Sequence, residues 1–414
     1  MPSDPSLALQ QAKSLVTALE SFDGSPAQHA QILLRLNRLR AAIEYPYDIS
    51  ARFIENTSTM AALNILIRLG ALQALPGVSP DSGDDDDKFI SAAELARRAN
   101  CDVSVILRPL RLLAVQGLVN QGPDPLTFRA NALTQAFQPS NLGSNPPMGM
   151  SFARTWSMLP SYVATHSPED IDNLLKTPWA YAHGVEGKSF YEGLDGDAVL
   201  RKAFDVTMRV MAENTQFRGI FPFKKVKEDV IGKEGVKERA FIVDVGGGKG
   251  QALRVIAEEC GGFGGMRGVL QDLESVVKVV ERDRLPEEVE TMVYDAFTEQ
   301  PVKHAHIYFL RHLLHDFPSP ACITILRNQA LAMAPDSRLI VCGLVMPDRV
   351  EVHGPTDLYW MDMGMMILGG RERTLGEFRE LFREAGLELV KVWGGEGGGE
   401  VMLEARLKAP GGSD

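Results

Sequence analysis

The sequence is poor in cysteine and lacks the patterns of disulfide-stabilised, zinc-binding and membrane-spanning proteins. Its 414 residues include four cysteines, Cys101, Cys260, Cys322 and Cys342, which lie far apart and form no C-x-x-C pair. This spacing predicts buried thiols in a reducing compartment and no metal site. No run reaches the roughly 20 apolar residues of a membrane span, and acidic and polar residues stand where a signal peptide is charged and then apolar. We therefore expect a cytoplasmic protein.

The sequence also lacks any dense block of lysine and arginine. Its formal net charge is -11 at pH 7, which argues against nucleic acid or an anionic membrane as the main partner. Hydrophobic residues make up 45% of the chain, an ordinary share for a soluble globular protein, and the length allows two or three domains.

The N-terminal third has apolar residues at helical spacing. This spacing runs from Leu9 to Glu44, is broken at Tyr45-Pro46-Tyr47, and returns from Met60 to Leu75. The acidic run Asp84–Asp87 is interpreted as a solvated surface loop. Helices alone would therefore make up most of this region.

A helix–turn–helix pattern followed by a β-ribbon comes next. Its parts are a helix capped by Ser91, a turn at Asn100–Asp102, a helix from Val103 to Gln116, and a ribbon from Gly117 to Asn131. This is the winged-helix pattern, which commonly binds DNA. The second helix has only Arg108 and Arg111 as cations and is otherwise apolar. We therefore expect it to be buried in a packing or dimerisation role.

The C-terminal half has the strand–helix alternation of a doubly wound α/β fold. Before it, aromatic-rich helical segments are expected from Met148 to Leu194, separated by Pro160, Pro168 and Pro178. The expected buried parallel strands are Phe241–Val245, Val269–Gln271, Thr291–Tyr294, Ile307–Leu310 and Leu339–Leu344. A closing helix at Glu377–Ala385 and an edge strand at Val401–Leu407 complete the prediction.

A glycine-rich turn follows the first of these strands and opens a helix. Asp244 closes the strand, and Gly246, Gly248 and Gly250 stand at alternate positions before the helix Leu253–Cys260. Bare backbone lets a ligand approach closely, because a Cβ there would collide with it. The G-x-G-x-G spacing differs from the G-x-G-x-x-G of a dinucleotide site. The turn alone therefore indicates only a nucleotide-like ligand.

Two further aspartates close the next two strands. Asp272 stands about 20 residues after the glycines, where a carboxylate can accept both ribose hydroxyls. Asp295 and the residues after it would border an adenine. Because no second phosphate-binding group lies near the turn, the pattern favours a nucleoside carrying a sulfonium over a pyrophosphate.

The ordered motifs resemble those of the caffeate/flavonoid-type small-molecule O-methyltransferases, in the style of the fungal natural-product members. They are Asp-Val-Gly-Gly-Gly-Lys-Gly, Leu-Gln-Asp-Leu, Tyr-Asp-Ala-Phe, Leu-Leu-His-Asp-Phe and Gly-Gly-Arg-Glu-Arg-Thr, and the likeness runs from about Ala61 to the C-terminus. The resemblance implies a Rossmann-like domain that binds S-adenosylmethionine and an N-terminal winged-helix-like domain that forms a homodimer. We expect a dimerisation domain at 1–145, a helical linker and substrate-pocket segment at 146–235, and the catalytic domain at 236–414.

The resemblance also implies roles for the residues of the cofactor site. It places Asp244 and the three glycines at the methionine end, Asp272 on the ribose, and Asp295 and Phe297 near the adenine. Leu273, Ala296 and Arg311 are further expected contacts, and Arg311 stands where the family often has a lysine.

Methyl transfer to a hydroxyl needs a base, and a neutral imidazole suffices for a phenol near neutral pH. By resemblance, His315 is this base, followed by Asp316, and Glu372 is one of the two acids that hold it; His312 is interpreted as structural. The position of the second acid falls on Gly343, which has no side chain. A missing carboxylate would leave the imidazole freer to rotate and less basic.

The expected substrate contacts are apolar or aromatic, with one carboxylate. They are Trp156, Phe204, Met208, Asp362, Met363 and Ile367. Methionine thioethers suit a planar, adaptable guest. Asp362 would either compensate for the acid missing at Gly343 or hydrogen-bond the substrate.

The leading hypothesis is an S-adenosylmethionine-dependent O-methyltransferase that acts on a hydroxyl of an aromatic or polyketide-like natural product. A second is a methyltransferase-like pericyclase or dehydrating cyclase that binds the cofactor without consuming its methyl group. The gap at Gly343 motivates it, with Asp362, His166 and His183 as alternative acids and bases. A third is a non-catalytic regulator that binds DNA.

Overall fold

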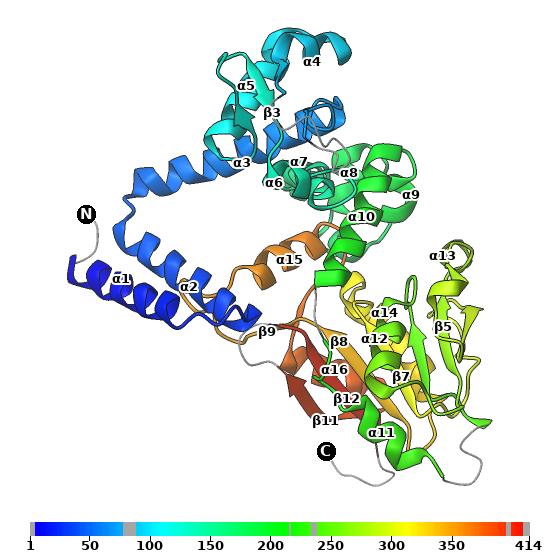
Figure 1. Cartoon of the computed structure of the whole chain (residues 1–414). Helices are drawn as coiled ribbons and strands as arrows, with labels where there is room; N and C mark the ends of the chain where they lie inside the picture. The colour runs from blue at the N-terminus through cyan, green and yellow to red at the C-terminus, as the bar shows by residue number, and fades with distance from the viewer. Residues whose placement is uncertain (1–4, 78–87, 215–216, 233–237, 395–398, 409–414) are drawn as a thin grey trace. The chain divides into compact units, whose positions relative to one another are not determined.

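The computed structural model describes residues 5–77, 88–214, 217–232, 238–394 and 399–408, and the chain divides into two compact units (Figure 1). Unit 1 comprises Met1–Pro168 and Leu174–Asn214, and unit 2 comprises Glu169–Asn173 and Thr215–Asp414. Each unit is described by itself. Among the described residues, no helix is both long and apolar enough to cross a membrane. The acidic run Asp84–Asp87 lies outside the described residues.

Unit 1 is built mainly of helices. Its elements are α1 (Pro5–Glu20), α2 (Pro26–Ile43), α3 (Pro46–Arg68), β1 (Ile90–Ser91), α4 (Ala92–Arg98), α5 (Val103–Val115), β2 (Asn120–Gln121), β3 (Thr127–Arg129), α6 (Ala132–Ala136), η1 (Leu142–Ser144), α7 (Asn145–Thr165), α8 (Pro178–His183), α9 (Phe190–Leu194) and α10 (Ala198–Asn214). The short helix η2 (Pro168–Asp172) joins the two units.

The predicted break at Tyr45-Pro46-Tyr47 is confirmed, because α2 ends at Ile43, but a new helix begins at once. Tyr45 caps α3, and Pro46 takes its first turn, where the missing N–H costs nothing because it would be unpaired anyway. The expected helix from Met60 to Leu75 is therefore the last part of α3, and it ends at Arg68 instead of Leu75. The stretch Leu9–Glu44 forms two helices instead of one, because Ser25 caps α2. Similarly, Pro160 lies inside α7 and does not separate two segments.

The helix–turn–helix and ribbon elements are present as predicted. Ser91 Oγ accepts the N–H of Glu94 and caps α4, and β1, β3 and β2 form a small antiparallel sheet. The apolar face of α5 is buried: Ile106, Leu110 and Leu113 have no exposed surface. This face packs in a core with residues of α3, α4 and β3, as expected for a helix that apolar.

Unit 2 contains a seven-stranded sheet in the order β11-β12-β8-β7-β4-β5-β6. The strands are β4 (Ile242–Val245), β5 (Gly268–Asp272), β6 (Val289–Val293), β7 (Ile307–Arg311), β8 (Arg338–Gly343), β11 (Leu387–Gly394) and β12 (Val401–Leu407). The strands from β4 to β8 in this sheet are parallel, whereas β12 runs antiparallel to β8 and β11 antiparallel to β12. The parallel strands confirm the prediction, with bounds that differ by only one or two residues.

The expected edge position of Val401–Leu407 is wrong. This segment, β12, lies between β8 and β11, and β11 is the edge strand. The strand β11 was not predicted, because only Leu387 in it is fully buried and most of its side chains are exposed. A strand without a buried apolar run gives little signal in a sequence.

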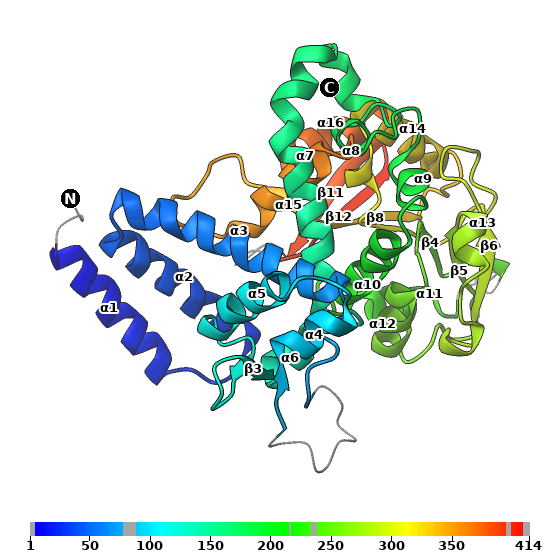
Figure 2. The ribbon, with the colours of Figure 1, turned by 90° about the horizontal axis from the view of Figure 1, so that it is seen from above.

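Helices cover both faces of this sheet (Figure 2). Unit 2 contains the helices α11 (Phe223–Val230), α12 (Gln251–Cys260), α13 (Glu274–Val277), η4 (Arg282–Arg284), η5 (Leu314–Asp316), α14 (Ser319–Ala330), α15 (Asp357–Met366) and α16 (Leu375–Glu384); a two-stranded sheet joins β9 (Val345–Met346) to β10 (Arg373–Thr374). One core contains residues of α14 and α16, and the other contains residues of α11 and α12. Successive strand residues alternate between these cores, as with Tyr308 and Phe309. This is the doubly wound arrangement.

Candidate active site

The glycine-rich turn takes a conformation that needs glycine. Gly246, Gly248 and Gly250 have φ values of 69°, 59° and 80°, a region that other residues rarely adopt. A Cβ on Gly246 would lie 2.9 Å from Leu313 Cδ1, and one on Gly250 would press on Leu285. A Cβ at Gly246 or Gly250 was expected to collide with a ligand. The structure shows that it would collide with side chains of the protein itself.

Backbone N–H groups of this turn are bonded within the protein. The amides of Gly246 and Gly247 donate to the carbonyl of Gln271, at 2.9 and 3.1 Å. The amide of Gly248 donates to Oδ2 of Asp272 at 2.8 Å. The end of β5 thus fixes the turn through three of its amides.

Asp244 is a buried carboxylate beneath the turn. Its side-chain oxygens make no hydrogen bond within the described residues, and a Cβ on Gly247 would lie 2.5 Å from its Oδ2. Burial raises the pKa of Asp244 to about 7, opposed by the positive charge of Arg311 and assisted by Asp272. A buried polar group without a partner calls for an explanation, and a ligand with a positive charge or N–H donors would provide one.

The other two predicted aspartates end the neighbouring strands. Asp272 closes β5, and its Oδ1 accepts the N–H of Leu273 at 2.7 Å, so each oxygen has one N–H donor and capacity for a further one. Burial raises its pKa, opposed by these backbone N–H groups. Asp295 is exposed and accepts the N–H of Phe297 at 3.0 Å. Ala296 follows Asp295 in the turn after β6.

The predicted base has the predicted partner. His315 lies in η5, after β7, and its Nδ1 is 2.8 Å from Oε1 of Glu372. Its Nε2 is 3.5 Å from Oδ1 of Asp316. Burial alone would lower the pKa of His315, but the negative charges of Asp316 and Glu372 raise it overall. Burial also raises the pKa of Asp316, against the opposing influence of His315 and His312.

Backbone hydrogen bonds, one of them to Asp362, hold the segment that carries Glu372 next to His315. Its Oδ1 accepts the backbone N–H of Glu372 at 2.9 Å, and the N–H of Arg371 donates to the carbonyl of His315 at 2.9 Å. The carboxyl group of Glu372 is almost completely buried. Asp362 therefore fixes the backbone that carries the first acid.

A buried carboxylate that was not predicted from the sequence, Glu400, lies at the same edge of the sheet. Glu400 directly precedes β12, and its Oε1 lies 2.7 Å from Arg311 Nη2 and 2.5 Å from His312 Nε2. The guanidinium of Arg311 also lies over the ring of Phe217, 4.9 Å from its centroid. Because β12 is antiparallel to β8, its amino end meets the carboxyl ends of the parallel strands. An antiparallel β12 in the sequence-based prediction would have placed Glu400 at this edge.

The expected substrate contacts fall in different units. Trp156, Phe204 and Met208 belong to unit 1, and Asp362, Met363 and Ile367 belong to unit 2. Met208 and Met363 are exposed, whereas Ile367 has no exposed surface and packs in the interior. Their contact with a substrate therefore stays a prediction.

Two other histidines considered as acids or bases are engaged in unit 1. Nε2 of His166 lies 2.8 Å from Glu186, and its Nδ1 is 3.0 Å from the carbonyl of Tyr162. His183 contacts Ser151 Oγ at 3.0 Å and the carbonyl of Trp179 at 2.9 Å. Burial lowers the pKa of His183. Both imidazoles thus have structural partners on each ring nitrogen.

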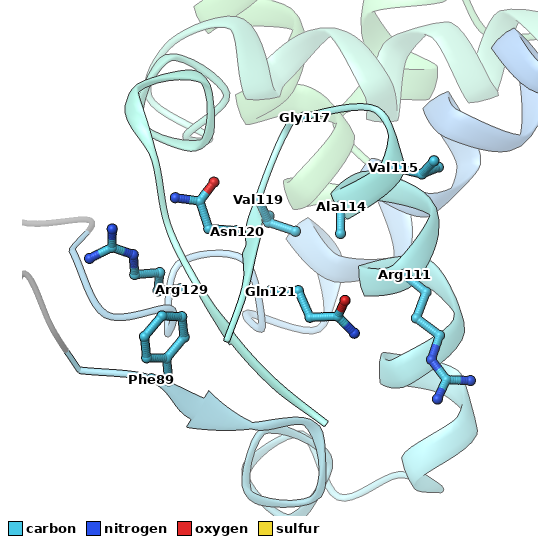
Figure 3. Close-up of a pocket in the computed structure, with 9 residues that line it drawn as sticks. All are labelled: Phe89, Arg111, Ala114, Val115, Gly117, Val119, Asn120, Gln121 and Arg129. Atoms are coloured by element: carbon cyan, nitrogen blue, oxygen red, sulfur yellow. The ribbon is translucent and has the colours of Figure 1, made fainter. Parts of the chain in front are cut away.

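An open cavity of about 700 Å³ lies in unit 1, between α5 and the ribbon (Figure 3). It is lined by Phe89, Arg111, Ala114, Val115, Gly117, Val119, Asn120, Gln121 and Arg129. The guanidinium of Arg129 lies 5.4 Å from the ring centroid of Phe89. None of the predicted site residues lines this cavity.

Comparison with solved structures identifies the class of this fold. The chain is 25% identical to LepI, solved in complex with S-adenosylmethionine, with a TM-score of 0.79 over 98% of this chain and 100% of that one. It is 23% identical to OxaC in complex with sinefungin and meleagrin, with a TM-score of 0.81 over 98% and 100%. A structure described as a pericyclic reaction enzyme is 24% identical, with a TM-score of 0.78 over 97% and 99%. The fold is that of the Rossmann-like S-adenosylmethionine-dependent methyltransferases.

The family follows from sequence comparison. Residues 156–388 match the model of the O-methyltransferase domain. The chain is 32% identical to the O-methyltransferase hmp5 of Hypomyces subiculosus over 405 residues, which cover 97% of this chain and 98% of that protein. The chain therefore belongs to the O-methyltransferase family. It is a methyltransferase, and its cofactor is S-adenosylmethionine.

Proposed function

We propose that the protein methylates a phenolic hydroxyl of an aromatic or polyketide-like natural product, with His315 as the general base. The observation that carries this proposal is the 2.8 Å contact between His315 Nδ1 and the buried carboxylate of Glu372. A carboxylate on one ring nitrogen selects the tautomer in which the other nitrogen accepts a proton. The expected acceptor of the phenolic proton is therefore Nε2.

Residues of the chain would each have a defined role in the proposed methyl transfer. The bound cofactor supplies an electrophilic methyl group on a sulfonium. Nε2 of His315 would take the proton of the acceptor hydroxyl and so make its oxygen more nucleophilic toward that methyl group. Glu372 and Asp316 then stabilise the imidazolium, which agrees with the raised pKa of His315. Asp362 maintains the geometry by fixing the backbone of Glu372.

The proposal predicts a preference set by the acidity of the acceptor. A neutral imidazole deprotonates a phenol far more readily than an alcohol. We expect naphthols and polyketide phenols to be methylated by the purified protein with S-adenosylmethionine, and the matching arylmethanols to give no product. Mass spectrometry of the products measures this. Equal rates for phenol and alcohol would contradict the role of His315.

We also propose that Asp244, Asp272 and the turn at Gly246–Gly250 hold the cofactor, with Leu273, Asp295, Ala296 and Phe297 beside its nucleoside. The fit rests on the unpartnered, buried carboxylate of Asp244. A cationic methionine portion would supply the charge and donors that this carboxylate lacks. Arg311, which is held by Glu400, would act by its charge near Asp244.

The affinity for S-adenosylmethionine is expected to rise as the pH is raised through about 7. Burial raises the pKa of Asp244 to about 7 in the free protein, and a bound cation favours its ionised form. Below that pH, binding must therefore release a proton, and the affinity falls by up to about tenfold per pH unit. Calorimetric titrations from about pH 5.5 to 8.5 measure this. Asp244→Asn should lose this dependence; an unchanged slope in the variant would exclude Asp244 as its source.

A pericyclase or dehydrating cyclase that leaves the methyl group unspent is the second candidate. The likeness to a structure described as a pericyclic reaction enzyme and the lack of a side chain at Gly343 favour it. The intact pair of His315 and Glu372 favours methyl transfer, because ring closure alone does not require a base held in this way. Product formation without S-adenosylhomocysteine would select this candidate.

We propose that unit 1 forms a homodimer through its N-terminal helices, with 1–145 as a winged-helix-like dimerisation domain. Large apolar side chains are exposed there, including Leu9 (57%), Val16 (52%), Phe53 (60%) and Ile54 (66%). Exposed apolar patches of this kind mark interaction surfaces.

A DNA-binding role is disfavoured by the net charge of -11. The unpaired thiols of the chain support a cytoplasmic location.

The double variant Phe53→Asp, Ile54→Asp is expected to convert a dimer into a monomer. Burying two carboxylates in an apolar interface costs several kcal/mol. Sedimentation velocity would measure the change, with Asn56→Asp, at an exposed polar position of the same helix, as the matched control. A wild-type protein that sediments as a monomer at micromolar concentration would contradict this proposal.

A further inference from the structure

A second histidine–carboxylate pair lies beside the first. His312 directly follows β7, and its Nε2 is 2.5 Å from Oε1 of Glu400, whose side chain has no exposed surface. The ring centroids of His312 and His315 are 5.3 Å apart. The proposed methyl transfer makes no use of His312.

Glu400 fixes which nitrogen of His312 carries a proton. Burial would raise the pKa of Glu400, but hydrogen bonds from His312 and Arg311 lower it to about 2. The ionised carboxylate can only accept, so Nε2 of His312 donates to it. In the neutral imidazole, Nδ1 is then left as a hydrogen-bond acceptor.

Nδ1 of His312 faces the space left by Gly343. Among the described residues, and apart from those adjacent in the chain, the one atom within 4 Å of a Cβ built on Gly343 would be Nδ1 of His312, at 4.0 Å. The side chain of His312 is 31% exposed. The position where a second acid was expected therefore offers room beside an acceptor nitrogen.

The backbone of His312 indicates that its orientation is imposed. Its φ is 49°, a value uncommon outside glycine, and its N–H donates to the carbonyl of Cys342 at 3.0 Å. Strained residues of this kind persist where the surroundings over-determine them, and they cluster at functional sites.

We propose that His312, oriented by Glu400, binds a second hydroxyl group of the acceptor in the space at Gly343. The protein would thus select aromatic acceptors that carry two neighbouring hydroxyls, of which one faces His315 and the other His312. This inference rests on the methyl transfer proposed above. It assigns a specificity-determining role to His312 and a positioning role to Glu400.

The test compares a naphthalene that carries two neighbouring hydroxyls with the naphthol that lacks one of them. Both are titrated into the full-length protein loaded with S-adenosylhomocysteine, so that binding is measured without turnover. We expect the diol to bind about tenfold more tightly to the wild type, and His312→Phe to remove this difference while leaving the affinity of the naphthol unchanged. Equal affinities in the wild type, or a preference retained in His312→Phe, would overturn the inference. A preference for the diol without any methylation would instead refute the proposed function alone.

Two further variants test the space and the orientation separately. Gly343→Val should fill the space and weaken binding of the diol only, whereas Gly343→Ala adds a Cβ that has room and serves as control. In Glu400→Gln, we expect the ¹⁵N resonances of His312 to show a mixture of tautomers, with a smaller preference for the diol. A single unchanged tautomer in that variant would remove Glu400 from the proposal.

Discussion

Replacing His315 by alanine is expected to lower kcat for methyl transfer by about a hundredfold to ten-thousandfold, the usual contribution of a general base. The variant keeps the glycine turn and the aspartates at the strand ends, so S-adenosylmethionine should still bind with wild-type affinity. Steady-state kinetics with a phenolic acceptor, together with calorimetry for the cofactor, measure the two effects. A wild-type rate in His315→Ala would refute the assigned base.

Glu372, which contacts His315, provides a control whose substitution should change the pH–rate profile. Glu372 helps to raise the pKa of His315, and the base acts in its neutral form. In Glu372→Gln the acidic limb of the pH–rate profile should therefore move to lower pH. A merely structural role for Glu372 would lower the rate without moving that limb.

Replacing Asp272 by alanine is expected to weaken the binding of S-adenosylmethionine by about a hundredfold. Hydrogen bonds to a charged group contribute about 1.5–3 kcal/mol each. The change would remove the expected ribose contact and also release the Gly248 N–H, which Asp272 Oδ2 accepts at 2.8 Å. Calorimetry or equilibrium dialysis measures the affinity.

A nearby carboxylate serves as the matched control for this change. Glu274 lies in the first turn of α13, is 67% exposed and pairs with Lys278 at 2.9 Å. Glu274→Ala removes the same charge close to the end of β5, and we expect it to change the affinity by less than about threefold, as for an exposed ion pair. If Asp272→Ala and Glu274→Ala lost the same affinity for S-adenosylmethionine, the effect of Asp272 would come from its charge at a distance and not from a ribose contact.

Those parts of the fold with a strong local signal were predictable from the sequence. Buried parallel strands contain continuous apolar runs, such as Ile307–Leu310, and the carboxyl ends of such strands meet at one edge. Asp244, Asp272 and His315 therefore come to the same edge as expected. The contact between His315 and Glu372 followed from the resemblance, because no local pattern links residues that far apart.

The remaining features depend on contacts between distant segments. Glu400 reaches the site only because β12 is antiparallel to β8, and an exposed edge strand, β11, precedes it. The glycine turn was assigned to ligand contact, whereas several of its amides are bonded to Gln271 and Asp272. The break at Pro46 was predictable, but the helix that begins there was not, because a proline fits both the first turn of a helix and the residues that follow a helix end. Which of the two applies depends on the capping residue before it.

The central claim is that the methyl group of the cofactor is spent. The most direct measurement is the ratio of S-adenosylhomocysteine to product when the purified protein turns over a phenolic acceptor with isotopically labelled S-adenosylmethionine. Methyl transfer predicts one S-adenosylhomocysteine for each product molecule, with the label on the product's oxygen. A product that forms without label and without S-adenosylhomocysteine would contradict this account and leave the cofactor as a bound, unspent group.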